Sequence, residues 1–187
     1  MREATKTRLL QAAITEIENH GVTELSVRRV AEQCGMSPAA PYRHFDDKND
    51  LILEVLKYTT EQWTNAQHEA LQRSGSTLRE QIVELCMAYI EFWYKNPELQ
   101  TILMMNDRAL QPAQREQKAM LSELSRELVH QYCRSVGMSE EDERRKVFVV
   151  RSLLFGAAFI INSGSEACME QALHTTRQMI EREFDLP

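Results

Sequence analysis

The chain has 187 residues, of which 43% are hydrophobic and 27% charged, and its formal net charge at pH 7 is −6. This composition is ordinary for a globular protein, and the length suffices for one or two domains with a substantial core. The most apolar run, 147–161, is 15 residues long and contains Arg151 and Ser152. A membrane-spanning helix needs about 20 apolar residues, so we expect no membrane partner. Because no apolar leader segment opens the chain, we also expect a cytoplasmic protein.

The negative charge is confined to the C-terminal part of the chain. Residues 1–48 hold seven Lys or Arg and seven Asp or Glu, whereas the remainder holds 15 basic and 21 acidic residues. The first 48 residues therefore carry no net charge and are free to approach a polyanion such as DNA.

The N-terminal segment predicts two helices and a glycine turn that leads into a third helix. The first helix is expected over 2–20, with Gly21 ending it. Ser26 is a suitable N-cap for the second helix, in which apolar residues recur with helical period. Gly35 ends that helix, and Ser37 is expected to cap the next. This arrangement is typical of a helix-turn-helix, although a tight corner in any helical bundle has the same pattern.

The third helix, Pro38–Phe45, carries two prolines in its first turn. Pro38 falls at the first helical position, where a proline costs nothing, and Pro41 removes only the first intrahelical hydrogen bond. Ala40 precedes a proline and is biased away from α geometry, so we expect a tightened or distorted first turn. The result is a stiff tip whose small side chains allow close approach to a surface.

Hydrogen-bond donors follow this tip directly, because Tyr42, Arg43 and His44 come next in the sequence. Asp47 is then expected to cap a long helix that begins at Lys48. The N-terminus of a helix beside a lysine is a suitable site for a phosphate group.

The rest of the chain predicts six further helices and no strands. Their expected ranges are 48–73, 77–95, 97–106, 112–136, 139–162 and, after Gly164, a last helix that reaches Phe184. We therefore expect an all-α fold with about nine helices.

Four short motifs together resemble the N-terminal domain of the TetR family of bacterial transcriptional repressors. They are SVRRVA at 26–31, GMS at 35–37, YRHF at 42–45 and KNDL at 48–51. They occur at the family's spacing over roughly residues 5–52, and Pro41 departs from the leucine that is more usual there. The resemblance implies a helix-turn-helix DNA-binding domain over 1–47. It also implies a helical bundle for ligand binding and dimerisation over 48–187.

The resemblance further implies a ligand-responsive repressor. Such a protein binds a pseudo-palindromic operator as a dimer and is released by a small apolar or aromatic inducer. The helix Pro38–Phe45 would enter the major groove, where Arg43 could reach a guanine and the two alanines could meet thymine methyl groups. Other contacts would fix the register on phosphates. The predicted DNA-contacting residues are Ser26, Arg28, Ser37, Ala39, Ala40, Tyr42, Arg43, His44 and Lys48.

The run 147–161 is apolar on every side, since 13 of its 15 residues are apolar or glycine. Such a helix is buried all round, either in the core of a monomer or at an interface. In the TetR resemblance the last two helices pair with their two-fold mates in a homodimer. The predicted interface residues are Val150, Leu154, Phe155, Ala158, Phe159, Met169, Leu173 and Ile180.

Aromatic residues and methionines gather on the expected helix 77–95 and on its neighbours. Stripes of this kind are more often plain core than a binding site. The resemblance nevertheless implies an inducer cavity in this bundle, and a soft lining rich in methionine suits an apolar or aromatic effector. The predicted ligand-binding residues are Trp63, Cys86, Met87, Tyr89, Trp93, Met104 and Met105.

Two alternatives remain open, a helical-bundle metalloprotein and a helix-turn-helix module for protein contacts. A di-iron bundle needs two Glu-x-x-His motifs, and the chain has one match, Glu127–His130. A module for protein contacts would not need donors on one phosphate-facing surface. The four cysteines lie outside any C-x-x-C pair and are expected to be reduced. We predict no catalytic residue, no metal site and no cofactor, and hence no enzyme.

Overall fold

The computed structural model describes residues 2–162 and 166–185 of the chain. Within these ranges there are nine α-helices, three short 3-10 helices and no strand. The predicted all-α fold with an N-terminal helix-turn-helix is therefore confirmed. Gly164, where we placed the break before the last helix, lies outside the described residues.

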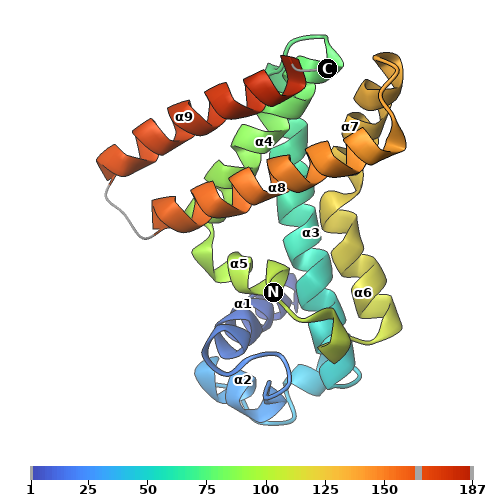
Figure 1. The fold of residues 1–187 in the computed structure, drawn as a ribbon. Helices are drawn as coiled ribbons and strands as arrows, with labels where there is room; N and C mark the ends of the chain where they lie inside the picture. Colours follow the sequence, from blue (N-terminus) through green and yellow to red (C-terminus); the bar gives the residue numbers. More distant parts are fainter. Residues whose placement is uncertain (1, 163–165, 186–187) are drawn as a thin grey trace. The chain divides into compact units, whose positions relative to one another are not determined.

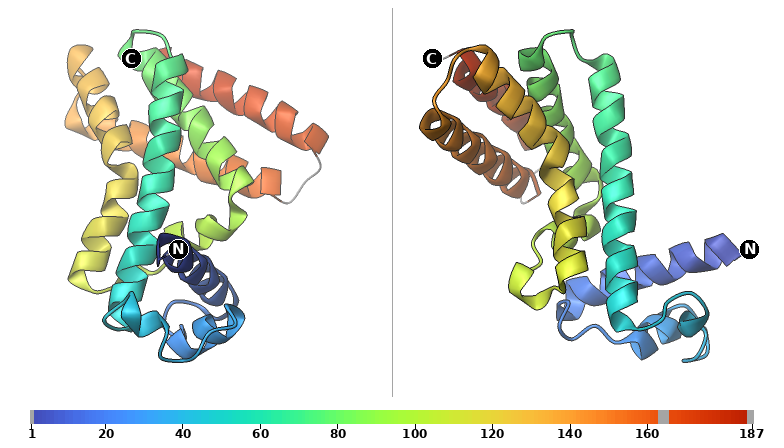
Figure 2. Two further views of the ribbon diagram at one scale, coloured as in Figure 1. Left: turned by 180° about the vertical axis from the view of Figure 1, so that it is seen from behind. Right: turned by 90° about the vertical axis from the view of Figure 1, so that its right-hand side faces the viewer.

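The chain divides into two compact units. Unit 1 consists of Met1–Gln62 and Pro97–Leu121, and unit 2 consists of Trp63–Asn96 and Ser122–Pro187. The helix α3 (Lys48–Arg73) contributes residues to both units and is drawn as one unbroken helix in Figure 2.

Unit 1 is built around its first helix. Besides the first part of α3, it contains α1 (Arg2–His20), α2 (Val27–Gln33), α5 (Pro97–Leu103) and α6 (Pro112–Ala119). The helix α1 packs against α2 and α5 (Figure 1). Because its apolar residues recur every three or four positions, Leu9, Ala13 and Ile17 lie buried on one face.

The turn after α2 depends on a glycine. Gly35 has a φ of +66°, which other residues adopt only with strain. The N–H of Met36 donates to the carbonyl of Ala31 at 2.9 Å and closes the end of the helix. At the start of α2, the Ser26 hydroxyl accepts the N–H of Arg29, as predicted for an N-cap. These local contacts fix where the chain leaves α2.

Unit 2 is organised around α4 (Leu78–Lys95). This helix packs against α7 (Glu123–Ser135), α8 (Glu140–Asn162) and α9 (Glu166–Asp185), and α8 also packs against α9 (Figure 1). Its start is fixed by a capping box, in which Thr77 and Glu80 each accept the other's backbone N–H.

The C-terminal end of α9 is held by side chains from three other helices. Lys146 of α8 donates to the carbonyl of Glu183, and Tyr132 of α7 donates to the carbonyl of Phe184. Arg79 of α4 donates to both carboxylate oxygens of Asp185, at 2.7 and 2.9 Å. The last carbonyls of a helix have no intrahelical partner, so the contacts from Lys146 and Tyr132 satisfy two of them, and the Arg79 ion pair further holds the end of α9.

The prediction of one continuous helix over 112–136 is wrong. The helix α6 ends at Ala119, a 3-10 turn covers Met120–Ser122, and α7 begins at Glu123. The buried Leu121 belongs to unit 1, whereas the buried Leu128 belongs to unit 2. The chain therefore turns where it passes between units, and Ser122 stands at the N-cap position, where serine is favoured.

No helix in the described ranges combines the length and the apolar character that crossing a membrane requires.

Candidate nucleic-acid interface

Residues 37–45, here called the recognition segment, do not form the α-helix predicted over Pro38–Phe45. Pro38 and Ala39 lie in a turn, and Pro41–Arg43 form a single 3-10 turn. The prolines are the physical cause. Pro41 has no N–H to donate to the carbonyl of Ser37, so this carbonyl accepts the N–H of Ala40 instead, at 2.9 Å.

The expected bias of Ala40 away from helical geometry is also wrong. Its backbone angles are φ −65° and ψ −41°, which lie in the helical region. The Ser37–Ala40 hydrogen bond holds the turn closed and outweighs the preference imposed by the following proline. The predicted distortion of the first turn therefore consists of 3-10 hydrogen bonding, whereas the backbone angles of Ala40 stay helical.

Buried residues anchor the recognition segment, and most of its polar residues are exposed. Pro41 and Phe45 are buried, and the N–H of Phe45 donates to the carbonyl of Pro41 at 3.0 Å. Tyr42 is 57% exposed. Of the predicted DNA contacts in the segment, Ser37, Ala39, Tyr42 and Arg43 are exposed, and Ala40 and His44 are half-buried. The structure therefore places these six residues within one exposed turn.

Two predicted DNA contacts, Arg28 in α2 and Ser26 at its N-cap, already have partners. The guanidinium of Arg28 is exposed, and its Nε donates to the carboxylate of Glu32 at 2.9 Å. A base or phosphate would have to compete with this neighbour. The Ser26 hydroxyl caps α2, which leaves its own O–H free to serve as a donor.

The N-terminus of α3 is also engaged. The ammonium of Lys48 donates to the carbonyl of Thr23 at 2.6 Å, and an ammonium has three N–H groups, so it can still bind a phosphate. The Asp47 carboxylate accepts the N–H of Asp50 at 2.8 Å, which confirms the predicted cap. The Asp50 carboxylate in turn accepts the N–H of Asp46 at 2.9 Å. The ammonium is therefore better placed for an anion than the helix end.

A buried carboxylate, which the sequence reasoning missed, joins α1 to α2. Glu16 is fully buried, and its carboxylate accepts from Arg29 Nε at 2.5 Å and from Gln33 Nε2 at 3.2 Å. His20 Nδ1 lies 3.4 Å from the same carboxylate. No sequence signal pointed to this contact, because its partners lie 13 and 17 residues away along the chain.

Comparison with known proteins agrees with this geometry. Residues 9–55 match the family profile described as bacterial regulatory proteins, tetR family. This N-terminal part of the chain therefore belongs to the TetR family of transcriptional regulators. It carries that family's DNA-binding helix-turn-helix, and the matched residues include α2, the recognition segment and the start of α3.

Solved structures share the fold of the chain at low sequence identity. PfmR from Thermus thermophilus, a TetR family transcriptional regulator, is 20% identical with a TM-score of 0.71, and the match covers 94% of each chain. A TetR-family regulator from Bordetella parapertussis is 14% identical with a TM-score of 0.74, covering 94% of this chain and 93% of that one. The regulator FadR from Bacillus subtilis, in complex with stearoyl-CoA, is 14% identical with a TM-score of 0.72. That match covers 93% of this chain and 96% of the other.

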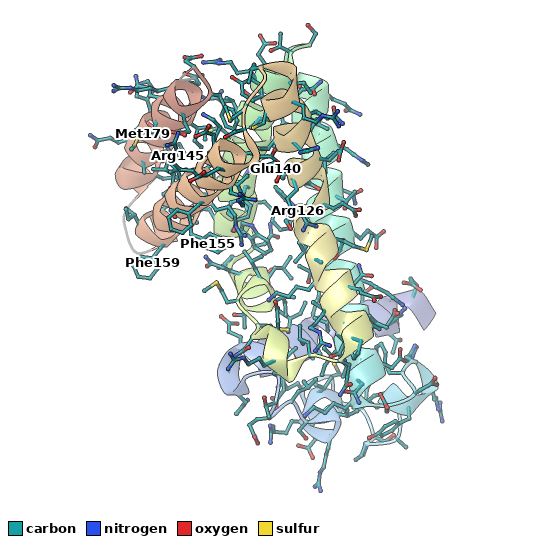
Figure 3. All side chains as sticks on the ribbon, turned by 45° about the vertical axis from the view of Figure 1, so that its right-hand side comes forward. Arg126, Glu140, Arg145, Phe155, Phe159 and Met179 are labelled. Atoms are coloured by element: carbon teal, nitrogen blue, oxygen red, sulfur yellow. The ribbon has the colours of Figure 1, made fainter. Side chains whose placement is uncertain are left out.

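The residues predicted for a dimer interface fall into two groups. Val150, Ala158 and Ile180 are buried within unit 2 itself, so a second chain cannot cover them further. The others retain exposed surface, and Phe159 is 74% exposed (Figure 3). Leu154, Phe155, Met169 and Leu173 are half-buried.

Three further apolar residues on α8 and α9 are exposed and were not among the predicted interface residues. Phe148 is 73% exposed, and Ile160 and Met179 are also exposed (Met179 in Figure 3). Phe148 and Ile160 lie inside the apolar run 147–161, so the sequence pattern could have identified them as interface candidates. A monomer seldom leaves so many large apolar side chains in water on two adjacent helices.

The predicted ligand-binding residues do not all come together. In unit 2 the ring of Trp63 lies 5.8 Å from that of Tyr89 and 6.4 Å from that of Trp93. Cys86 and Met87 are buried on α4, and burial raises the pKa of the Cys86 thiol to about 12. Met104 and Met105 belong to unit 1, where Met104 is exposed and Met105 buried.

The residues considered for metal binding take part in ordinary contacts. His130 Nδ1 lies 3.1 Å from the carboxylate of Glu143 on α8, and Glu127 accepts from Gln131 at 2.7 Å. In the ranges that the structure describes, no three His, Cys, Asp or Glu side chains form a group that could hold a metal ion. The side chain of Cys168 lies outside the described residues.

Proposed function

We propose that this TetR-family regulator is a cytoplasmic repressor that binds a pseudo-palindromic operator as a homodimer and is released by a small apolar or aromatic effector. The observation that carries the proposal is the recognition segment, an exposed turn of small side chains and hydrogen-bond donors held on a buried anchor. Residues 1–47 would form the DNA-binding domain, and residues 48–187 would bind the effector and the second protomer.

The recognition segment enters the major groove in this proposal. Its tip is narrow because the small residues Ala39 and Ala40 directly precede the 3-10 turn, so methyl groups and backbone can approach base edges. Arg43 contacts a guanine, and Arg28 reaches a base after it leaves Glu32. The contacts from Ser26, Ser37, Tyr42, His44 and Lys48 go to phosphates and fix the register.

The homodimer forms through α8 and α9. Their exposed apolar side chains supply the surface, and two protomers related by a two-fold axis would present two recognition segments to the two half-sites. Half-sites one helical turn apart, or a small multiple of a turn, fit this symmetry.

The effector binds in unit 2, near the aromatic side chains of α3 and α4. The rings of Trp63, Tyr89 and Trp93 offer an apolar surface for it. The stearoyl-CoA bound by the similarly folded FadR supports an effector with a large apolar part. The helix α3 carries Trp63 and begins at Lys48, and its 26 residues span about 39 Å. A small pivot at Trp63 would therefore displace Lys48 relative to DNA.

The proposal is tested by effector titrations on an operator complex. Apolar metabolites and drugs are first screened for compounds that raise the melting temperature of the protein. Each hit is then titrated into the complex of protein and operator DNA. We expect at least one hit to weaken operator binding, and by linkage that compound binds the DNA-bound protein more weakly by the same factor. Hits that all leave operator affinity unchanged would contradict effector control and leave a constitutive DNA-binding regulator.

A further inference from the structure

We infer that the effector carries a hydrogen-bond acceptor, such as a neutral carbonyl oxygen, which accepts from the side chains of Gln67 and Trp93. This inference rests on the proposed effector binding by unit 2 and specifies the chemistry of the compound.

Two buried donors of unit 2 find no acceptor in the part of the chain that the structure describes. Gln67 and Trp93 are only 3% and 1% exposed. Among residues 2–162 and 166–185, neither Gln67 Nε2 nor Trp93 Nε1 has a hydrogen-bond partner. A buried donor that loses its hydrogen bonds to water and gains none in return destabilises the folded state, so native proteins contain few of them. Two in one unit indicate that an acceptor is supplied from outside the chain.

Both donors lie beside the same aromatic side chain. Gln67 follows Trp63 by four residues on α3, so the two side chains share one face of that helix. The ring of Trp93 on α4 lies 6.4 Å from the ring of Trp63. The rings of Phe92 and Tyr89 lie 4.9 and 5.9 Å from the ring of Trp93, so apolar rings flank the Trp93 donor.

The chemistry of the donors sets the chemistry of the ligand. An indole N–H can only donate, and so can an amide nitrogen. The missing group must therefore accept, and two neutral donors suit a neutral carbonyl oxygen better than a full charge. The aromatic rings favour an apolar body attached to this carbonyl. A ketone, ester, amide or thioester with a large hydrocarbon part meets both conditions.

The test uses pairs of compounds that differ only in the acceptor. Benzophenone is compared with diphenylmethane, and 2-undecanone with undecane, each titrated into the full-length protein by calorimetry. We expect the ketone of at least one pair to bind about five- to tenfold more tightly than its hydrocarbon, as for one or two net hydrogen bonds. The variants Gln67→Met and Trp93→Phe keep apolar bulk but remove a donor. Each should lower the affinity for the ketone about threefold or more and leave that for the hydrocarbon unchanged.

Two controls separate this effect from a general loss of structure. Gln131→Met removes an exposed glutamine of unit 2 and should leave both affinities unchanged. The chain has two tryptophans, so its NMR spectrum has two indole N–H signals, and Trp93→Phe identifies which of them belongs to Trp93. That signal should shift with the ketone and stay in place with the hydrocarbon.

The outcomes distinguish this inference from the proposed function. Equal affinities within both pairs, or a preference for the ketone that survives Gln67→Met, would overturn the acceptor while leaving an apolar effector in place. A large fall in melting temperature of ligand-free Gln67→Met would also overturn it, because the amide would then serve a structural contact such as a bound water. If no compound of either pair binds, both the acceptor and the effector site are wrong, while operator binding is unaffected.

Discussion

Glu16 is the residue on which the position of α2 depends most directly. Its carboxylate is fully buried and accepts from Arg29 and Gln33, so α1 and α2 are joined by charge-assisted hydrogen bonds in addition to apolar packing. Since α2 leads into the recognition segment, this contact holds the segment in place for DNA.

We therefore expect Glu16→Gln to destabilise the protein by about 1–3 kcal/mol, because an amide cannot satisfy the Arg29 guanidinium as a carboxylate does. The expected loss of stability is moderate because the side chain of Arg29 is partly exposed to solvent. Urea denaturation measures the change. Glu32→Gln, which affects the exposed pair with Arg28, is the control and should cost much less. Equal effects of the two substitutions would contradict the structural role of Glu16.

Substitutions of the neighbouring residues Tyr42 and Arg43 should affect DNA binding in different ways. Tyr42→Phe removes one hydroxyl that is proposed to contact a phosphate, so affinity should fall about tenfold on every sequence alike. Arg43→Ala removes a base contact and should cost about 1–3 kcal/mol at one base pair only. Both are measured by competition between operator variants. A change of base preference with Tyr42→Phe, or none with Arg43→Ala, would show that the roles are assigned wrongly.

Residues whose partners are local could be predicted from sequence, and those with distant partners could not. Ser26, Asp47 and Gly35 were assigned correctly to helix ends because their hydrogen bonds reach at most a few residues along the chain. Glu16 bonds to residues that are 13 and 17 positions away. The sequence holds no sign of such a pairing until the packing of the helices is known.

At the scale of elements, the recognition segment illustrates how local chemistry overrides periodicity. The pattern of residues predicted a helix, and the two prolines predicted its distortion, but the balance between them depends on individual hydrogen bonds. The missing N–H of Pro41 shifts the Ser37 carbonyl to Ala40, and a 3-10 turn results. The break between α6 and α7 was not predicted for another reason. It depends on tertiary packing, because Leu121 before the break is buried in unit 1 and Leu128 after it is buried in unit 2.

The end of α9 offers a test at this scale. Lys146 is buried, donates to the carbonyl of Glu183 and lies over the ring of Phe184 at 5.4 Å. Lys146→Met should therefore destabilise the protein by about 1–3 kcal/mol, because the carbonyl loses its donor. Arg145→Met changes the adjacent residue, whose side chain is exposed, and serves as the control with a smaller effect. Denaturation midpoints that are equal for the two variants would refute the role of Lys146 in fixing α9.

At the scale of the whole molecule, the apolar surface of α8 and α9 governs assembly. Phe159→Arg should leave the protomer folded, because the side chain is 74% exposed, but should place a charge in the proposed dry interface. We expect a folded monomer in sedimentation at micromolar concentration, and loss of binding to a two-half-site operator. Met104→Arg alters a side chain of unit 1 that is 65% exposed, and should remain dimeric. A wild-type protein that sediments as a monomer, or a dimeric Phe159→Arg, would rule out this interface.

The central claim is that two copies of the chain read one pseudo-palindromic operator. The most direct measurement is enrichment and sequencing of the genomic fragments that the protein retains at physiological salt, followed by the mass of the complex on the enriched motif. The account predicts a motif with two-fold symmetry, half-sites about one helical turn or a small multiple apart, and an even number of protomers per motif. Retention of fragments without a shared motif, or one protomer bound to an asymmetric site, would contradict it.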